Sequence, residues 1–238
     1  MSTVETGKFE PYTGTDLNLG ASGDAVTLPA GVTLKTNTIK DSGGNTIFTS
    51  NGSGTLSSVN SSLQGNMVFI SSQTASSSAS LSFTSGIDST YDEYVFYFVN
   101  IHGSHDGAHM SFQAGASYNT TMTTTNFQAY HSEDDGTTNL AYDTGWDQAQ
   151  GTGFQQLLIK LGTDNDQSGA GELHLFAPSS TTYVKQFYFR GNTNASNDYS
   201  YDSYTAGYFN TTSALTQVQF KATAGNLDAG SIYLYGIK

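Results

Sequence analysis

Three of the five histidines lie close together, between His102 and His109. His102, His105 and His109 share this stretch with Asp106, and imidazoles and carboxylates are groups that bind transition metals. A metal site needs three or four ligands that converge on one point. His109 falls inside an expected strand, and the other two histidines are far away in the sequence. We therefore keep only His102, His105 and Asp106 as weak metal candidates.

The elements around these histidines predict a hairpin. EYVFYFVNI (93–101) and AHMSFQA (108–114) are typical of strands, and HGSHDG lies between them. Gly103 and Gly107 supply the backbone freedom that a tight connection requires. We expect the histidines to occupy the tip of this hairpin. A metal on a three-fold axis, with one histidine from each subunit, is the remaining alternative.

Two acidic stretches could also carry chemistry. Glu133, Asp134 and Asp135 could form a glycosidase carboxylate pair, but their polar surroundings predict a solvated turn. Asp164 and Asp166 alternate with Ser168 as at the start of a calcium loop. Leu175 stands where the loop's bidentate glutamate belongs. Both aspartates therefore remain weak metal candidates, and we expect no catalytic residue.

Aromatic residues among small polar ones suggest a surface that binds sugars. The candidates come from NDYSYDSYTAGYFN (197–210) and from the loop YDTGWDQAQG. Aromatic rings can stack on sugar rings while neighbouring polar groups bind the hydroxyls. The alternative is that the rings pack in a subunit interface, where Tyr and Trp are also enriched. The glycan-binding candidates are Trp146, Tyr142, Tyr199, Tyr201 and Tyr204.

The composition indicates an all-β protein. Of its 238 residues only 12% are charged, against the usual quarter or so, while 15 are Tyr and 14 are Phe. The net charge of −12 argues against binding to nucleic acid. The absence of cysteine excludes disulfides and thiol nucleophiles. We expect neither a signal peptide nor a membrane span, because no basic and apolar leader and no long apolar run is present.

The chain is expected to divide near residue 62. In residues 1–62, apolar pairs such as Val26 and Leu28, then Val32 and Leu34, alternate with turn signals such as DSGGN and SNGSG. Strands this short bury too little surface to be stable alone. We therefore predict an intertwined oligomer, most simply a trimer, that forms a stalk or attachment segment. The alternative is a flexible linker.

Residues 63–238 predict an antiparallel β-sandwich of jelly-roll type. Leu173 and Leu175 alternate with polar residues, as do Ile232 and Leu234 with tyrosines. The strand around 94–101 is apolar on both faces, so we expect its outer face to meet another subunit. The expected strands span residues 66–71, 79–84, 93–101, 108–114, 125–131, 154–161, 171–177, 183–191, 216–223 and 230–238.

Three stretches share their pattern with a family of phage proteins. They read YDEYVFYFVNIHGSHDGAHMSFQAG (91–115), GELHLFAPSSTTYVKQFYFRG (171–191) and AGYFNTTSALTQVQFKATAGNLDAGSIYLYGIK (206–238). They resemble a Y-x-x-Y-x-F-x-F-x-N-I-H strand and hairpin, paired strands around an L-x-L-F-x-P-S-S turn, and a terminal G-N-x-x-x-G-x-I-x-L-Y-G-I-K of marine bacteriophage virion structural proteins. The N-terminal stretch 33–60 resembles the attachment segments of such fibre-like proteins.

The resemblance covers roughly residues 25–60 and 90–238, and the closing motif is its most specific part. The chain departs from the hairpin pattern at Gly103, where the family often has proline. The resemblance implies a trimeric fibre, spike or head-decoration component of a virion, with no catalytic motif and no cofactor.

Together these observations lead to the expectation of a non-enzymatic virion protein, assembled in the host cytoplasm. Residues 1–62 would dock on other virion proteins of the tail or capsid. The C-terminal sandwich of a homotrimer would be displayed for adsorption to a host surface glycan. Two alternatives remain, a capsid decoration protein and, less favoured, a polysaccharide depolymerase.

Overall fold

A computed structural model describes residues 36–60 and 65–238 of the chain. Contacts within the chain divide it into two units, Met1–Leu63 and Gln64–Lys238. We therefore describe each unit by itself. The strands expected around Val26–Leu28 and Val32–Leu34 lie outside the described residues. Within the described part every regular element is a β-strand, and no helix is long and apolar enough to cross a bilayer.

The described part of the first unit is a three-stranded antiparallel sheet. Its strands are β1 (Thr38–Lys40), β2 (Thr46–Ser50) and β3 (Leu56–Val59), in that order. The two predicted turns join them, and in the first turn the Asp41 carboxylate accepts the backbone N–H groups of Gly43 and Asn45. Among residues 36–60, Ser58 aside, no side chain reaches full burial. This sheet therefore gains little stability from a core of its own.

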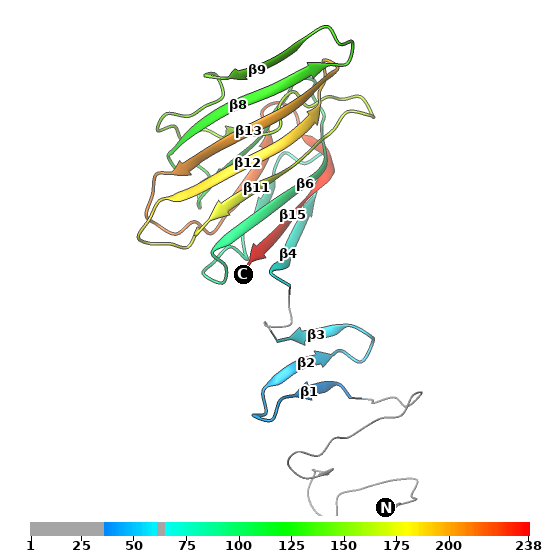
Figure 1. Cartoon of the computed structure of the whole chain (residues 1–238), viewed down its shortest axis with the longest axis vertical. Coiled ribbons are helices and arrows are strands. Elements are labelled where there is room, and N and C mark those ends of the chain that lie inside the picture. The colour runs from blue at the N-terminus through cyan, green and yellow to red at the C-terminus, as the bar shows by residue number, and fades with distance from the viewer. Residues whose placement is uncertain (1–35, 61–64) are drawn as a thin grey trace, which may run out of the picture. The chain divides into compact units, whose positions relative to one another are not determined.

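The second unit contains two antiparallel sheets, consistent with the predicted β-sandwich. The larger has the strand order β4-β15-β6-β11-β12-β13-β8-β9, and its strands lie side by side in Figure 1. The smaller has the order β10-β7-β14-β5. The strands of the larger sheet are β4 (Met67–Thr74), β6 (Glu93–Gly103), β8 (Met122–Ser132), β9 (Thr138–Tyr142), β11 (Gly169–Phe176), β12 (Lys185–Asn194), β13 (Tyr199–Phe209) and β15 (Leu227–Ile237). Those of the smaller are β5 (Leu81–Phe83), β7 (Met110–Ala114), β10 (Gln155–Gln156) and β14 (Val218–Ala222).

Aromatic rings fill the space between the two sheets. Phe220 of the small sheet lies at the centre of this aromatic core and is fully buried. Its ring centroid is 5.3 Å from that of Phe96 and 5.2 Å from that of Phe98, both on β6. Phe83 and Phe112 of the small sheet also contact it. The predicted alternation is confirmed, because Leu173, Leu175, Ile232 and Leu234 are all buried in this core.

Most expected strands form close to their predicted bounds, but the stretch 154–161 is an exception. Only Gln155 and Gln156 form a strand, and the apolar residues that follow are buried as irregular chain. Lys160 has a positive φ of 53°, which interrupts any regular strand here. Backbone hydrogen bonds to Met110 and Ala108 satisfy the buried peptide groups instead. A continuous apolar run indicates burial, and it was wrong to infer strand from it.

The predicted hairpin around the histidines is also wrong. β6 belongs to the large sheet, where it pairs with β11 and β15. β7 belongs to the small sheet, where it pairs with β10 and β14. Residues 104–109 therefore carry the chain from one sheet to the other. A short glycine-containing connection between two strands suits either arrangement, so the sequence alone could not separate them.

Two strands of the large sheet have no counterpart among those expected. β13 occupies the run of tyrosines 199–208, and β9 follows the acidic turn at 133–136. β13 pairs along its whole length with β12 and β8. The run TNLAY of β9 is largely exposed, so it lacks the apolar alternation that marks an ordinary strand.

Candidate functional site

The outer face of the large sheet is rich in exposed aromatic and aliphatic side chains. Side chains alternate between the faces of a sheet, so those facing away from Phe96 and Leu173 face outward. Nine large hydrophobic side chains are exposed in the described part of the chain. The registers place seven of them on this face: Met67, Phe69, Val99, Phe127, Leu140, Tyr142 and Tyr188. Single exposed apolar residues are common, whereas a gathering on one face marks an interaction site.

A row of cross-strand neighbours runs through this face across seven strands, from β15 to β9. Each member is paired in register with the next. Aromatic and charged side chains in such rows contact each other directly. The row consists of Tyr233, Tyr97, Glu172, Arg190, Tyr204, Phe127 and Tyr142.

The middle of this row is held by close contacts. The rings of Phe127 and Tyr204 stack in parallel, with centroids 4.7 Å apart and planes 4° apart. The Arg190 guanidinium lies 5.0 Å from the centroid of Tyr204 and donates two hydrogen bonds to the Asp202 carboxylate. Those hydrogen bonds raise the pKa of Arg190. The Tyr204 hydroxyl donates to the same carboxylate at 3.0 Å, which raises the pKa of Tyr204.

A hollow of about 240 Å³ opens beside this stack. The small residues Ala206 and Thr125 line it, together with the aromatic residues Tyr188, Tyr204 and Phe127. Tyr188 is 41% exposed, and one face of its ring is stacked on His174 at 4.4 Å. The register pairs Tyr188 with His174 on one side and with Ala206 on the other. The side of Tyr188 toward Ala206 is therefore open.

A second, wider hollow of about 640 Å³ adjoins the first. The two share Glu172 and Arg190 in their linings. Ala170, Asn192 and Asp202 also line the second hollow. The two hollows therefore adjoin at Glu172 and Arg190, and the second is lined by the aromatic residues Tyr97 and Phe98 as well as by polar groups.

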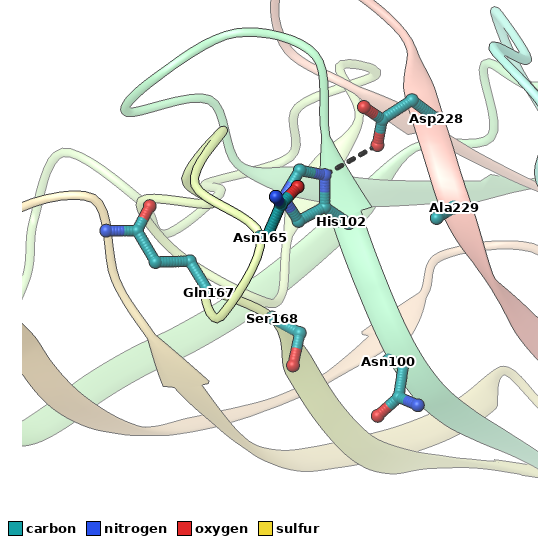
Figure 2. A pocket seen from close by; sticks show the side chains of 7 residues that line it. All are labelled: Asn100, His102, Asn165, Gln167, Ser168, Asp228 and Ala229. Atoms are coloured by element: carbon teal, nitrogen blue, oxygen red, sulfur yellow. Dashed lines mark hydrogen bonds and ion pairs between the residues drawn. The ribbon is translucent and has the colours of Figure 1, made fainter.

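A separate, polar pocket of about 460 Å³ surrounds His102, as Figure 2 shows. His102 Nδ1 lies 2.7 Å from Asp228 Oδ1, and Nε2 lies 3.0 Å from the Asp164 carbonyl oxygen. Both partners are acceptors, so this geometry favours the doubly protonated ring. Burial lowers the pKa of His102, but the hydrogen bonds to Asp228 and Asp164 outweigh it and the pKa is raised above 6.5. Amide and hydroxyl groups from Asn100, Asn165, Gln167 and Ser168 complete the lining, with Ala229.

The weak metal candidates lie near one another, but each makes other bonds. The Asp106 carboxylate accepts the backbone N–H and hydroxyl of Thr163. His105 Nδ1 is 2.9 Å from the Asp106 carbonyl oxygen. The backbone carbonyl oxygen of Asp164 lies in hydrogen-bond contact with His102, and that of Asp166 accepts a hydrogen bond from Asn194. Within the described residues, no group of three or more His, Cys, Asp or Glu side chains is placed to hold a metal ion.

His109, the third histidine of the cluster, has a different environment. Its ring lies 4.9 Å from the ring of Trp146. Its Nδ1 accepts the backbone N–H of Lys160 at 3.3 Å. Burial, with a smaller contribution from the charge of Lys160, lowers the pKa of His109 to about 4. His109 is therefore neutral near pH 7.

The acidic residues Glu133, Asp134 and Asp135 form the predicted exposed turn between β8 and β9. The Asp134 carboxylate accepts the Gly136 N–H at 2.9 Å. The side-chain hydrogen bond from Ser132 lowers the pKa of Asp134, with the Gly136 bond as the next cause. Such a carboxylate stays ionised and stabilises the turn rather than serving as a proton donor.

The five predicted glycan-binding residues fall into two groups. Tyr142 and Tyr204 lie on the outer face, in the cross-strand row. Trp146, Tyr199 and Tyr201 instead pack around a small second core with Ile159 and Ala195. Tyr201 is only 3% exposed, so it is closed to a ligand.

Tyr188, Arg190 and Phe127 line the hollow, and none of them was among the residues predicted from the sequence. The alternation in KQFYFRG carries a signal for the first two, because Phe187 and Phe189 face the core and leave Tyr188 and Arg190 outside. No such pattern singles out Phe127. It joins the site only because β13 pairs with β8.

Comparisons of the chain with protein-family models, with curated proteins and with solved structures return no match.

Proposed function

We propose that this chain is a non-enzymatic structural component of a bacteriophage virion. In this proposal it is a trimeric fibre or spike protein, assembled in the host cytoplasm, whose segment 1–62 binds other virion proteins. Its C-terminal sandwich, with jelly-roll-like connectivity, is displayed for adsorption to a host surface glycan. The observation that carries the proposal is the exposed aromatic outer face of the large sheet. Such a face suits binding, and it needs no catalytic group.

The N-terminal sheet supports the trimeric, intertwined part of the proposal. Its register places Ile39 beside Phe48 in one cross-strand row, and neither side chain is fully buried. A sheet with an apolar face buries that face against another element. Further copies of the same row in an intertwined segment would supply that element.

Light scattering of the purified chain tests the oligomer. We expect a mass of about 76 kDa, three times the 25.3 kDa of one chain. Phe48→Ser should reduce this mass, because it places a hydroxyl in the apolar row. Lys40→Ser, at an exposed position of the same sheet, should leave it unchanged. A monomeric wild-type chain would contradict the trimer.

Cryo-electron microscopy of the particles that carry the chain tests its place in the virion. Trimers on the tail with residues 63–238 pointing outward would support adsorption. Density on the capsid shell would favour the alternative of a decoration protein. New reducing ends after incubation with host polysaccharide would overturn the non-enzymatic assignment and support the depolymerase.

A further inference from the structure

We infer that the hollow beside Tyr188 is a binding subsite for one neutral hexopyranose ring, and that the adjoining hollow takes the next sugar unit. The inference deepens the proposed function, on which its biological role rests. This site centres on Tyr188, Phe127 and Arg190, which were not among the glycan-binding residues expected from the sequence.

The ring of Tyr188 is pre-organised for stacking on a ligand. His174 stacks on one face of that ring with planes 13° apart, and Glu93 holds His174 through a hydrogen bond to Nδ1. The opposite side borders Ala206, whose side chain is too short to cover it. A ring fixed in this way loses little freedom when a ligand stacks on it. Its open face suits the apolar C–H face of a pyranose.

The size and the lining of the hollow match a single sugar ring. Its volume of about 240 Å³ is below the usual pocket range of about 300–1,000 Å³, which suits a single ring. Tyr204 and Phe127 line it together with Tyr188, and Ala206 and Thr125 leave the space between them empty. The larger hollow of about 640 Å³ continues from Glu172 and Arg190. A linked second sugar can therefore extend in that direction.

The edge of the site carries polar groups that can bind sugar hydroxyls. Arg190 uses Nε and Nη2 for Asp202, which leaves its Nη1 group available as a donor. Glu172 offers carboxylate acceptors, and Asn192 offers an amide in the second hollow. Sugar hydroxyls both donate and accept, so they match this mixture of groups.

The same charges argue against the other occupants of this face. A second copy of the chain packed here would remove Arg190, Asp202 and Glu172 from water, and burying charges is costly. The formal net charge of −12 repels acidic polysaccharides. A neutral sugar is not repelled by the net charge, and its hydroxyls can replace the water at Arg190 and Glu172.

Saturation-transfer NMR on the full chain tests the inference with four probes. These are the methyl glycosides of glucose, galactose and mannose, and N-acetylglucosamine. At least one should bind with a Kd in about the millimolar range. Tyr188→Ala should weaken that binding at least about tenfold, because the stacking surface is lost. Ala206→Phe, which fills the hollow, should abolish it.

Tyr183→Ala is the matched control, since Tyr183 is 72% exposed and does not line either hollow. Its binding should equal that of the wild type. Circular dichroism melts must show that the variants remain folded. If Tyr188→Ala does not fold, Ala206→Phe and Phe127→Ala replace it in the binding test. The inference is overturned if no probe binds, or if a folded Tyr188→Ala or Ala206→Phe variant binds like the wild type.

Three further outcomes distinguish failure of the inference from failure of the proposed function. If Tyr188→Ala dissociates the oligomer and no probe binds, the face is a subunit interface and the inference fails. Sugar binding by a chain that is absent from virions would refute only the proposed function. A chain present in virions that binds no probe would refute only the inference.

Discussion

His109 should make the stability of the sandwich depend on pH in a mildly acidic range. In the folded chain its Nδ1 accepts the Lys160 N–H, so Nε2 carries the proton and the ring is neutral. Protonation of Nδ1 would place a positive charge against this donor and near the Lys160 ammonium. The Asp143 carboxylate raises the pKa only in part, and the pKa stays at about 4 against an ordinary value of 6.5.

The sign and size of the effect follow from these two values. Between them, the unfolded chain binds more protons than the folded chain, so stability falls as the pH is lowered from 6.5 toward 4. By linkage, a shift from 6.5 to about 4 destabilises the fold by about 2.5 kcal/mol at about pH 4.5. At about pH 7.5 the contribution vanishes, because the ring is neutral in both states.

Urea unfolding followed by tryptophan fluorescence measures this directly, since Trp146 is the only tryptophan and contacts His109. The comparison is with His109→Gln, whose amide oxygen can accept the Lys160 N–H without titrating. Between about pH 7.5 and 4.5 the wild type should lose about 2.5 kcal/mol more than His109→Gln. Losses due to carboxylates are common to both proteins and cancel. A difference below about 0.5 kcal/mol would refute the argument that burial keeps His109 neutral.

Three further predictions concern the core and the bonds that join loops to strands. Phe220→Ala should cost about 3–5 kcal/mol in urea unfolding, because it empties the centre of the aromatic core; a cost below about 1 kcal/mol would contradict that packing. Lys185→Ala should cost about 1–3 kcal/mol in the same assay, because the buried Nζ donates to two backbone carbonyls that would lose their partner; an unchanged midpoint would contradict this role. NMR titration should give His102 a pKa above 6.5, and Asp228→Asn should lower that pKa. The stability that the His102–Asp228 pair contributes is present below pH 6.5 and is lost as the pH rises through the pKa of the folded chain. An unchanged titration in Asp228→Asn would show that the pair does not set the pKa.

The sequence predicted the fold class well, because alternation is a local property. Strands such as β11, β14 and β15 place apolar side chains on one face and polar or tyrosine side chains on the other, and all three were expected. The turns of the N-terminal sheet were also expected, from their Asp, Asn and Gly residues. Signals of this kind need no knowledge of the rest of the chain.

The candidate site could be predicted only in part, because it depends on which strands are neighbours. Tyr204 and Tyr142 were expected to bind sugars, and they meet Phe127 and Arg190 only through the pairing of β13 with β12 and β8 and of β8 with β9. Trp146 and Tyr201 had the same composition signal, yet they pack around the small second core, where Tyr201 is buried and Trp146 is partly buried. Composition indicates which residues suit a ligand, whereas the face on which each lies follows from pairing between distant segments.

The position of β15 has a consequence for how the chain is made. This strand follows every other strand of the sandwich in the sequence, yet it lies between β4 and β6. β4 has no other neighbour in the sheet, so the first sandwich strand to leave the ribosome finds its partner only after the last one has emerged. Until then β4 and the open edge of β6 expose unpaired backbone groups. Until β15 emerges, the nascent sandwich is therefore vulnerable to aggregation.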